Sequence, residues 1–147
     1  MTPEKKDRPL KVMFLCTGNS CRSQMAEGFA RELGRGMIEP HSAGLLETIV
    51  HPRAIEVMKE KGIDISGQRS KPIDEDLLRK MDVIVTLCGL AEAMCPLTPP
   101  GIKRLYWPIN DPVGTVGSEK KITKEFRRAR DEIRTKIEAF IRHLDTV

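Results

Sequence analysis

The sequence has few aromatic residues, no long apolar run and only four cysteines, and each shortage excludes a class of protein. Its 147 residues contain one Trp and one Tyr, too few for the aromatic platforms on which single-stranded nucleic acids stack. No apolar stretch approaches the roughly 20 residues that a membrane-spanning helix needs. A chain of this length buries about two-thirds of its unfolded surface, so it can fold without disulfides or a structural metal. We therefore expect a monomeric globular protein with no nucleic-acid or membrane partner.

The N-terminal sequence MTPEKKDRP is charged and no apolar core follows it, unlike a signal peptide. We expect residues 1–9 to be a flexible lead-in and residues 10–147 to form one domain, since domains commonly span about 100–150 residues. The net charge of +4 suits either an anionic ligand or an ordinary basic surface. The expected compartment is the cytoplasm, where thiols stay reduced and cysteines serve catalysis or metal binding more often than structural disulfides.

Short apolar segments alternate with amphipathic ones along the chain. Residues 10–15 (LKVMFL) form an apolar run without alternation, which is typical of a buried parallel strand. Residues 22–33 carry apolar side chains at helical spacing. The alternation predicts an α/β fold in three layers, with a small parallel sheet of about four strands and helices on both faces. The expected strands are 10–15, 37–43, 82–87 and 102–107, and the expected helices are 22–33, 52–61, 74–80, 89–94 and 121–143.

Three reactive side chains follow the ends of different expected strands. Cys16 follows the first strand, Cys88 the third and Asp111 the fourth. Ligands of parallel sheets bind beyond the carboxyl ends of the strands. We therefore expect these three side chains to meet at one edge of the sheet.

The segment CTGNSCRS, residues 16–23, predicts an oxyanion site where the first strand passes into the first helix. Its small residues let successive backbone N–H groups turn inward, forming a nest at a helix N-terminus that suits a tetrahedral anion. Arg22 adds a bidentate guanidinium. This positive environment favours the thiolate form of Cys16, to which the Ser23 hydroxyl can donate. The expected substrate-binding residues are Thr17, Gly18, Asn19, Ser20, Cys21, Arg22 and Ser23.

Some of these residues have alternative interpretations. Cys21 is either a redox partner of Cys16 or a small buried filler. Asp111 precedes Pro112, so it either protonates a leaving oxygen as a general acid or simply forms a turn. The four cysteines could also bind zinc, but C-x4-C and C-x6-C spacings are not those of the usual short zinc knuckles. Arg22 would moreover lie beside the cation, which disfavours zinc.

Cys88 and Cys95 flank a segment, LAEAM, with strong helix propensity. A helix across it separates the two sulfurs by about 10 Å along the axis, whereas a disulfide needs Cα atoms within roughly 4.4–6.8 Å. A bond between them therefore requires the segment to unwind, which Gly89 and Pro96 at its ends favour. The segment is a redox switch if both cysteines act, and Cys88 is otherwise a buried residue at the end of a strand.

Taken together, these segments resemble the thioredoxin-coupled arsenate reductases, which share the low-molecular-weight tyrosine phosphatase fold. The resemblance rests on LCTGNSCRSQMAEG, HSAG, KGIDIS, VTLCG followed by CP and TPP, and the DP pair at residue 111. It covers nearly all of the chain after the first nine residues. It implies arsenate as the substrate, thioredoxin as the reductant, no cofactor, a role in arsenic detoxification and a side phosphatase activity.

The resemblance also implies a role for each reactive residue. Cys16 attacks arsenate held by the loop and Arg22, while Asp111 protonates the departing oxygen. Cys88 then attacks the Cys16–arsenic adduct, which releases arsenite and leaves a Cys16–Cys88 disulfide. Cys95 attacks Cys88 in turn, which frees Cys16 and leaves a Cys88–Cys95 disulfide for thioredoxin to reduce.

One position departs from the family pattern. Some members hold a potassium ion with residues that match Asn19, Glu27 and Ser42, together with an aspartate just after a DIS-x-x-x-S stretch. Here that stretch is DISGQRS and Lys71 follows it. A lysine ammonium can take the place of the cation, so we predict no metal site.

The alternative function is that of a low-molecular-weight protein tyrosine phosphatase, which shares the nucleophile, the loop arginine and the aspartate. Such phosphatases typically carry tyrosines after the DP pair, where this chain has VGT, and they have no need of both downstream cysteines. A third interpretation is a non-catalytic module that binds oxyanions or senses thiols.

Overall fold

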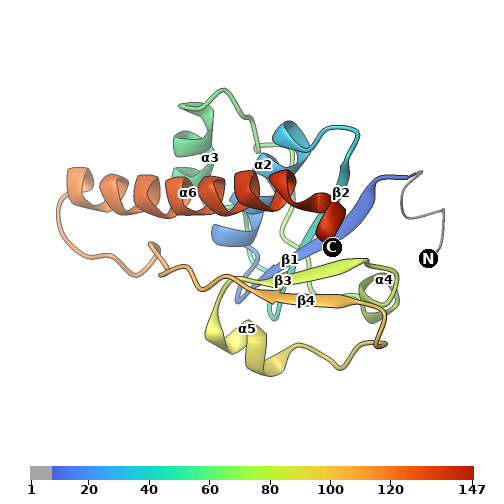
Figure 1. Cartoon of the computed structure of the whole chain (residues 1–147). Coiled ribbons are helices and arrows are strands. Elements are labelled where there is room, and N and C mark those ends of the chain that lie inside the picture. The colour runs from blue at the N-terminus through green and yellow to red at the C-terminus, as the bar shows by residue number, and fades with distance from the viewer. Residues whose placement is uncertain (1–7) are drawn as a thin grey trace.

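The computed structural model describes residues 8–147, in which four parallel strands form one sheet (Figure 1). Most of the expected lead-in, residues 1–7, lies outside the described residues. The strand order is β2-β1-β3-β4, and the parallel sheet predicted from the sequence is confirmed. The strands are β1 (Leu10–Cys16), β2 (Ile38–Gly44), β3 (Val83–Thr86) and β4 (Lys103–Tyr106).

Helices cover both faces of the sheet, as the sequence predicts (Figure 1). Three long helices lie on one face and two short ones on the other, which makes three layers. Among residues 8–147, no helix has the length and apolar character needed to cross a bilayer. The helices are α2 (Arg22–Leu33), α3 (Pro52–Lys59) and α6 (Glu119–Arg142) on the first face, α4 (Glu75–Leu78) and α5 (Gly89–Met94) on the second, and a short 3-10 helix, η1 (Leu144–Thr146), at the C-terminus.

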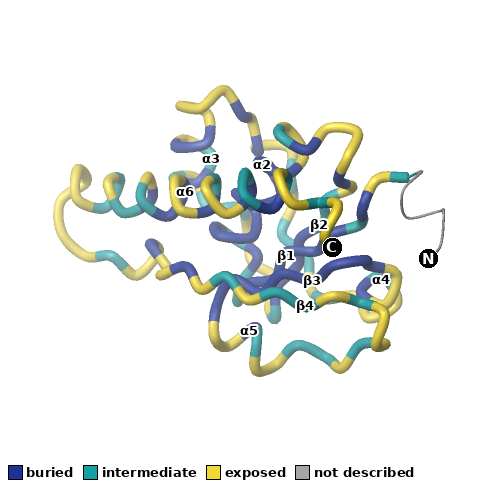
Figure 2. The backbone as a smooth tube through the Cα atoms, viewed as in Figure 1, coloured by how far each residue is buried: buried dark blue, intermediate teal, exposed yellow. Residues whose placement is uncertain are grey.

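Successive residues of β1 point into two different apolar cores. Val12 and Phe14 pack in the larger core with α2, α3 and α6, whereas Met13 and Leu15 pack in the smaller core with α4 and α5. Figure 2 shows β1 and β3 as the buried centre of the molecule. Burial on both faces explains why β1 is apolar from Val12 to Cys16, and each large buried side chain contributes roughly 1.5–3 kcal/mol of stability.

The bounds of three helices differ from expectation. The expected helix 74–80 is a single turn that ends at Leu78, with Asp74 as its cap through hydrogen bonds accepted from two backbone N–H groups. The expected helix 52–61 ends at Lys59. Helix α6 begins at Glu119, two residues earlier than expected, because the Ser118 side chain caps it by accepting from the backbone N–H of Lys121. The expected helix 89–94 is confirmed with the same bounds.

Candidate active site

The loop 17–21 between β1 and α2 surrounds a cavity of about 240 Å³ at the carboxyl edge of the sheet. Cys16, the last residue of β1, lies at its base, and Arg22, the first residue of α2, lies at its side. Asp111 reaches the same cavity from the loop after β4. Cys16 and Asp111, which follow the ends of different strands, therefore meet at one edge of the sheet, as the sequence predicts.

The Cys16 sulfur is buried and faces a directed hydroxyl donor. Ser23 Oγ lies 2.8 Å from Cys16 Sγ, and the side-chain amide of Asn19 donates to Ser23 Oγ at 2.7 Å. Because Ser23 Oγ accepts from Asn19, its own proton is free to point at the sulfur. The arrangement directs a hydroxyl proton at the nucleophilic sulfur.

Asn19 stabilises the conformation of the loop 17–21 through its backbone and its side chain. Its φ of 48° is in the left-handed region, which asparagine tolerates better than most residues. Its side-chain oxygen accepts from the backbone N–H of Lys71 at 2.8 Å and from the Gln24 amide at 3.0 Å. Asn19 and Ser23 are fully buried and are not among the residues that line the cavity, so their part in substrate binding stays a prediction.

Gly44, in the HSAG motif, lets the end of β2 pass close to this loop. A Cβ at Gly44 would lie 2.6 Å from the backbone nitrogen of Asn19 and 2.9 Å from the carbonyl carbon of Gly18. Both contacts are with backbone, which cannot move aside without reshaping the loop. A side chain at this position would therefore distort the oxyanion site.

Arg22 links the loop to Asp111. It is 7% exposed, and its Nη1 donates to the carbonyl of Ile109 at 2.9 Å, while its Nη2 lies 3.5 Å from Asp111 Oδ2. The other oxygen of Asp111 accepts from the backbone N–H of Val113 at 3.0 Å. Both interpretations of Asp111 therefore fit the geometry, since the turn that it makes with Val113 also aims its carboxylate at the cavity.

Cys21 is buried next to the nucleophile. Burial raises the pKa of the Cys21 thiol far above its ordinary value, and the neighbouring Asp111 and Cys16 raise it further. The thiol form therefore persists across the physiological range. This disfavours a redox role for Cys21, which also lines the cavity.

Cys88 lies between the oxyanion loop and α5. Its sulfur is 3.4 Å from Thr17 Oγ1 and accepts the backbone N–H of Ala91 at 3.3 Å, so Cys88 is the N-cap of α5. Cys95 is the C-cap at the other end of the helix and does not line the cavity. All four cysteines are free. A six-residue helix spans about 9 Å, so it separates Cys88 from Cys95 as expected.

At the position that matches the family's potassium site, two cationic side chains already pair with Glu27. Lys71 Nζ lies 3.8 Å from Glu27 Oε1, and Arg31 pairs with the other oxygen of Glu27. The Ser42 hydroxyl donates to the same carboxylate. One carboxylate between two cationic side chains has no net negative charge for a bound cation, so these residues do not fit a potassium ion.

Comparison with known proteins places the chain in a family. Residues 11–147 match the sequence profile of the low molecular weight phosphotyrosine protein phosphatases. The chain belongs to this family. Its relatives include an arsenate reductase of Bacillus subtilis, 47% identical over 129 residues that cover 88% of this chain and 93% of that protein. The resemblance seen in the sequence is thereby confirmed.

Solved structures agree. An arsenate reductase in the phosphate binding state superposes with a TM-score of 0.74 at 42% identity, covering 90% of this chain and 96% of that chain. A thioredoxin-dependent arsenate reductase of Corynebacterium glutamicum superposes with a TM-score of 0.66 at 28% identity, covering 90% of this chain and 63% of that chain. Both of these structural neighbours are arsenate reductases, and both share the fold of this chain.

One residue of the cavity wall has no signal in the sequence. Thr48, in the loop after β2, lines the cavity and donates to the carbonyl of Gly18 at 2.7 Å. It belongs to no motif, because it reaches the cavity only through the path of a surface loop. Val113, the first residue of the VGT after the DP pair, also lines the cavity.

Proposed function

We propose that this chain reduces arsenate to arsenite and that its oxidation passes through Cys16, Cys88 and Cys95 in turn to thioredoxin. The observation that carries the proposal is the position of Cys88, with its sulfur beside the oxyanion loop and a short helix leading from it to Cys95. A phosphatase needs only the loop and the acid. The arsenate reductases among the relatives support the substrate, and the thioredoxin-dependent neighbour supports the reductant.

The first step takes place in the cavity. The loop N–H groups and Arg22 hold the arsenate oxygens, and the Cys16 thiolate attacks arsenic. Asp111 supplies the proton with which one oxygen leaves as water. The product is a covalent adduct between the Cys16 sulfur and arsenic(V).

The second step reduces the arsenic. The Cys88 thiolate attacks the Cys16 sulfur, the sulfur–arsenic bond breaks, and its electron pair leaves with arsenic as arsenite. The Thr17 hydroxyl, which belongs to the residue after Cys16, lies 3.4 Å from the Cys88 sulfur, and this supports transfer between the two cysteines. The Cys16–Cys88 disulfide that results removes Cys88 from its capping contact with α5.

The third step moves the disulfide to the surface. Cys95 attacks Cys88, the Cys16–Cys88 bond breaks, and Cys16 leaves as a thiolate. The Cys88–Cys95 disulfide is then available to thioredoxin. The protein acts as a monomer in the cytoplasm, where thioredoxin is kept reduced, and its role is arsenic detoxification.

Steady-state turnover tests the proposal. With arsenate, thioredoxin, thioredoxin reductase and NADPH, the protein should oxidise NADPH in proportion to the arsenite formed, because each turnover consumes one reduced thioredoxin. A phosphatase would hydrolyse an aryl phosphate without any arsenate-dependent oxidation of NADPH. A non-catalytic module would do neither, and either of these two results would overturn the proposal.

The phosphatase alternative keeps one observation in its favour. Cys16, Arg22 and Asp111 surround the cavity in a way that also suits transfer of a phosphoryl group. We therefore expect slow hydrolysis of small aryl phosphates as a side activity. Val113 stands on the cavity wall where the phosphatases of the family have tyrosines.

Amide hydrogen exchange on the reduced and oxidised protein tests the helix that must unwind. We expect residues 89–94 to be protected in the reduced form and to lose protection by about tenfold or more after arsenate oxidation without thioredoxin, since a helix of this length is marginal by itself. The amides of β1 serve as the internal control and should not change. Equal protection of residues 89–94 in the two forms would rule out the unwinding.

A further inference from the structure

One acidic side chain of helix α5 forms hydrogen bonds with two strands of the sheet. Glu92, in the middle of α5, accepts a hydrogen bond from Thr86 Oγ1 at 2.7 Å through one oxygen. Its other oxygen accepts from Arg104 Nη2 at 3.2 Å. Thr86 is the fully buried last residue of β3, and Arg104 belongs to β4. Glu92 therefore fixes the helix to two neighbouring strands.

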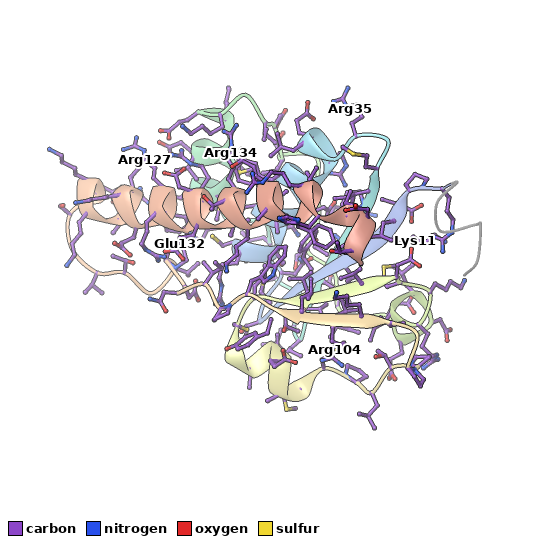
Figure 3. The ribbon with its side chains drawn as sticks, viewed as in Figure 1. Lys11, Arg35, Arg104, Arg127, Glu132 and Arg134 are labelled. Carbon is purple, nitrogen blue, oxygen red and sulfur yellow. The ribbon has the colours of Figure 1, made fainter. Side chains whose placement is uncertain are left out.

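One nitrogen of Arg104 forms no hydrogen bond in this arrangement. Its Nε is buried and, among residues 8–147, is the one buried side-chain nitrogen or oxygen without a hydrogen-bond partner. Figure 3 labels Arg104 on the side of β4 that faces α5. A buried donor without a partner is unfavourable and calls for an explanation. A half-exposed ion pair stabilises a fold only slightly, so stability alone does not explain an arginine here.

The same two charges act on Cys95. Burial raises the pKa of the Cys95 thiol above its ordinary value, Arg104 opposes the rise, and Glu92 adds to it. These are the charged side chains that act on Cys95 from α5 and from β4; its other surroundings include the smaller apolar core, against which it packs. While α5 is helical, the pKa of Cys95 is therefore held above its ordinary value, which lowers the fraction of the reactive thiolate.

Unwinding of α5 removes the negative charge near Cys95 and leaves the positive charge in place. Glu92 is part of α5 and leaves Thr86 and Arg104 when the helix opens, whereas Arg104 stays on the sheet. The guanidinium then has lost its carboxylate partner, and Cys95 has lost the negative charge that opposed its ionisation.

We propose that Arg104 is a positioning residue of the disulfide relay: it binds Glu92 while α5 is helical and turns to the sulfur of Cys95 once α5 unwinds. This inference rests on the proposed function. Cys95 loses its proton to solvent, and its thiolate, held by the guanidinium, forms a bond to the Cys88 sulfur. The Cys16–Cys88 bond breaks and its electron pair leaves on Cys16, where the Ser23 hydroxyl stabilises the thiolate.

A single turnover with arsenate in the absence of thioredoxin isolates this step. Samples are quenched in acid and alkylated, and mass spectrometry separates protein with the Cys16–Cys88 disulfide from protein with the Cys88–Cys95 disulfide. In Arg104→Gln, we expect the Cys16–Cys88 form to accumulate and its conversion to be about tenfold slower near neutral pH. The rate profile should move up by about one pH unit, which corresponds to a tenfold change in the thiolate population.

Three further variants make the readout specific. Arg104→Lys retains a positive charge and should recover most of the rate, while Glu92→Gln should leave the position of the pH profile unchanged, because Glu92 has already moved away when Cys95 attacks. Arg79→Gln is the matched control, because Arg79 forms an exposed ion pair with Asp76 on the same face of the sheet and should behave as wild type.

The outcomes separate this inference from the proposed function. If the wild-type protein forms no Cys88–Cys95 disulfide, the relay itself is wrong. If the wild type forms it and Arg104→Gln does so at the same rate and with the same pH profile, only the role of Arg104 is overturned. An equally slow conversion at every pH, without rescue by lysine, would make Arg104 merely structural and would also overturn the inference.

Discussion

Replacement of Cys16 by serine should abolish both arsenate reduction and aryl phosphate hydrolysis, each by on the order of a thousandfold or more. Both reactions begin with attack by the same sulfur, and a serine hydroxyl is not ionised near neutral pH. The substitution changes one buried atom that already contacts Ser23 at 2.8 Å, so we expect the fold to persist. Initial rates of arsenite formation and of phenolate release measure the two losses.

Cys21→Ser is the matched control for this experiment. It makes the same exchange at a second buried cysteine of the same loop, and we expect both activities to remain within a few-fold of wild type. Arsenate turnover near the wild-type rate in Cys16→Ser would contradict the assignment of the nucleophile. Loss of arsenate turnover in Cys21→Ser would instead make Cys21 a redox partner.

Serine at either of the two downstream cysteines should stop repeated reduction of arsenate while leaving aryl phosphate hydrolysis largely intact. Hydrolysis needs only the groups around the cavity, and Cys95 does not line it. Reduction needs two more sulfurs to return the nucleophile to its thiolate. Arsenite counted per enzyme distinguishes the two positions: Cys95→Ser should release about one equivalent and stop with the Cys16–Cys88 disulfide, whereas Cys88→Ser should release none.

The two activities measured in parallel provide the control. Hydrolysis at the wild-type rate shows that the loop and the fold are intact in each variant. If both activities disappear together, Cys88 and Cys95 support the fold and do not form a relay. Sustained arsenate turnover in Cys95→Ser with thioredoxin would mean that the reductant attacks the Cys16–Cys88 disulfide directly.

The structure gives α5 two supports that the chemistry can remove. Cys88 caps its N-terminus through the backbone N–H of Ala91, and Glu92 ties its middle to Thr86 and Arg104. In the proposed relay, we expect the first disulfide to withdraw the cap and so to weaken a helix that is already short. We therefore expect α5 to open after the release of arsenite.

Local patterns in the sequence determined the parts of the molecule that depend on nearby residues. The apolar run of β1, the small-residue loop before α2 and the helix propensity of α5 each depend on a few consecutive residues, and the structure agrees with all three. The helix expected at 121–143 had a wrong start, because the Ser118 side chain caps α6 through a hydrogen bond that periodicity does not reveal. The helices expected at 52–61 and 74–80 begin close to the expected residues, but they end two residues early, at Lys59 and Leu78.

The ends of the strands predicted that distant residues meet at one edge of the sheet, but only the tertiary structure decided which atoms touch there. Thr17 meets Cys88 across 71 positions of the chain, and Arg22 lies 3.5 Å from Asp111. The hydrogen bond between Asn19 and Ser23 directs a hydroxyl at the nucleophile, and the unpaired nitrogen of Arg104 depends on how β4 packs against α5. Such contacts are set by packing across the sheet, and a one-dimensional pattern carries no distance between segments that are far apart in the chain.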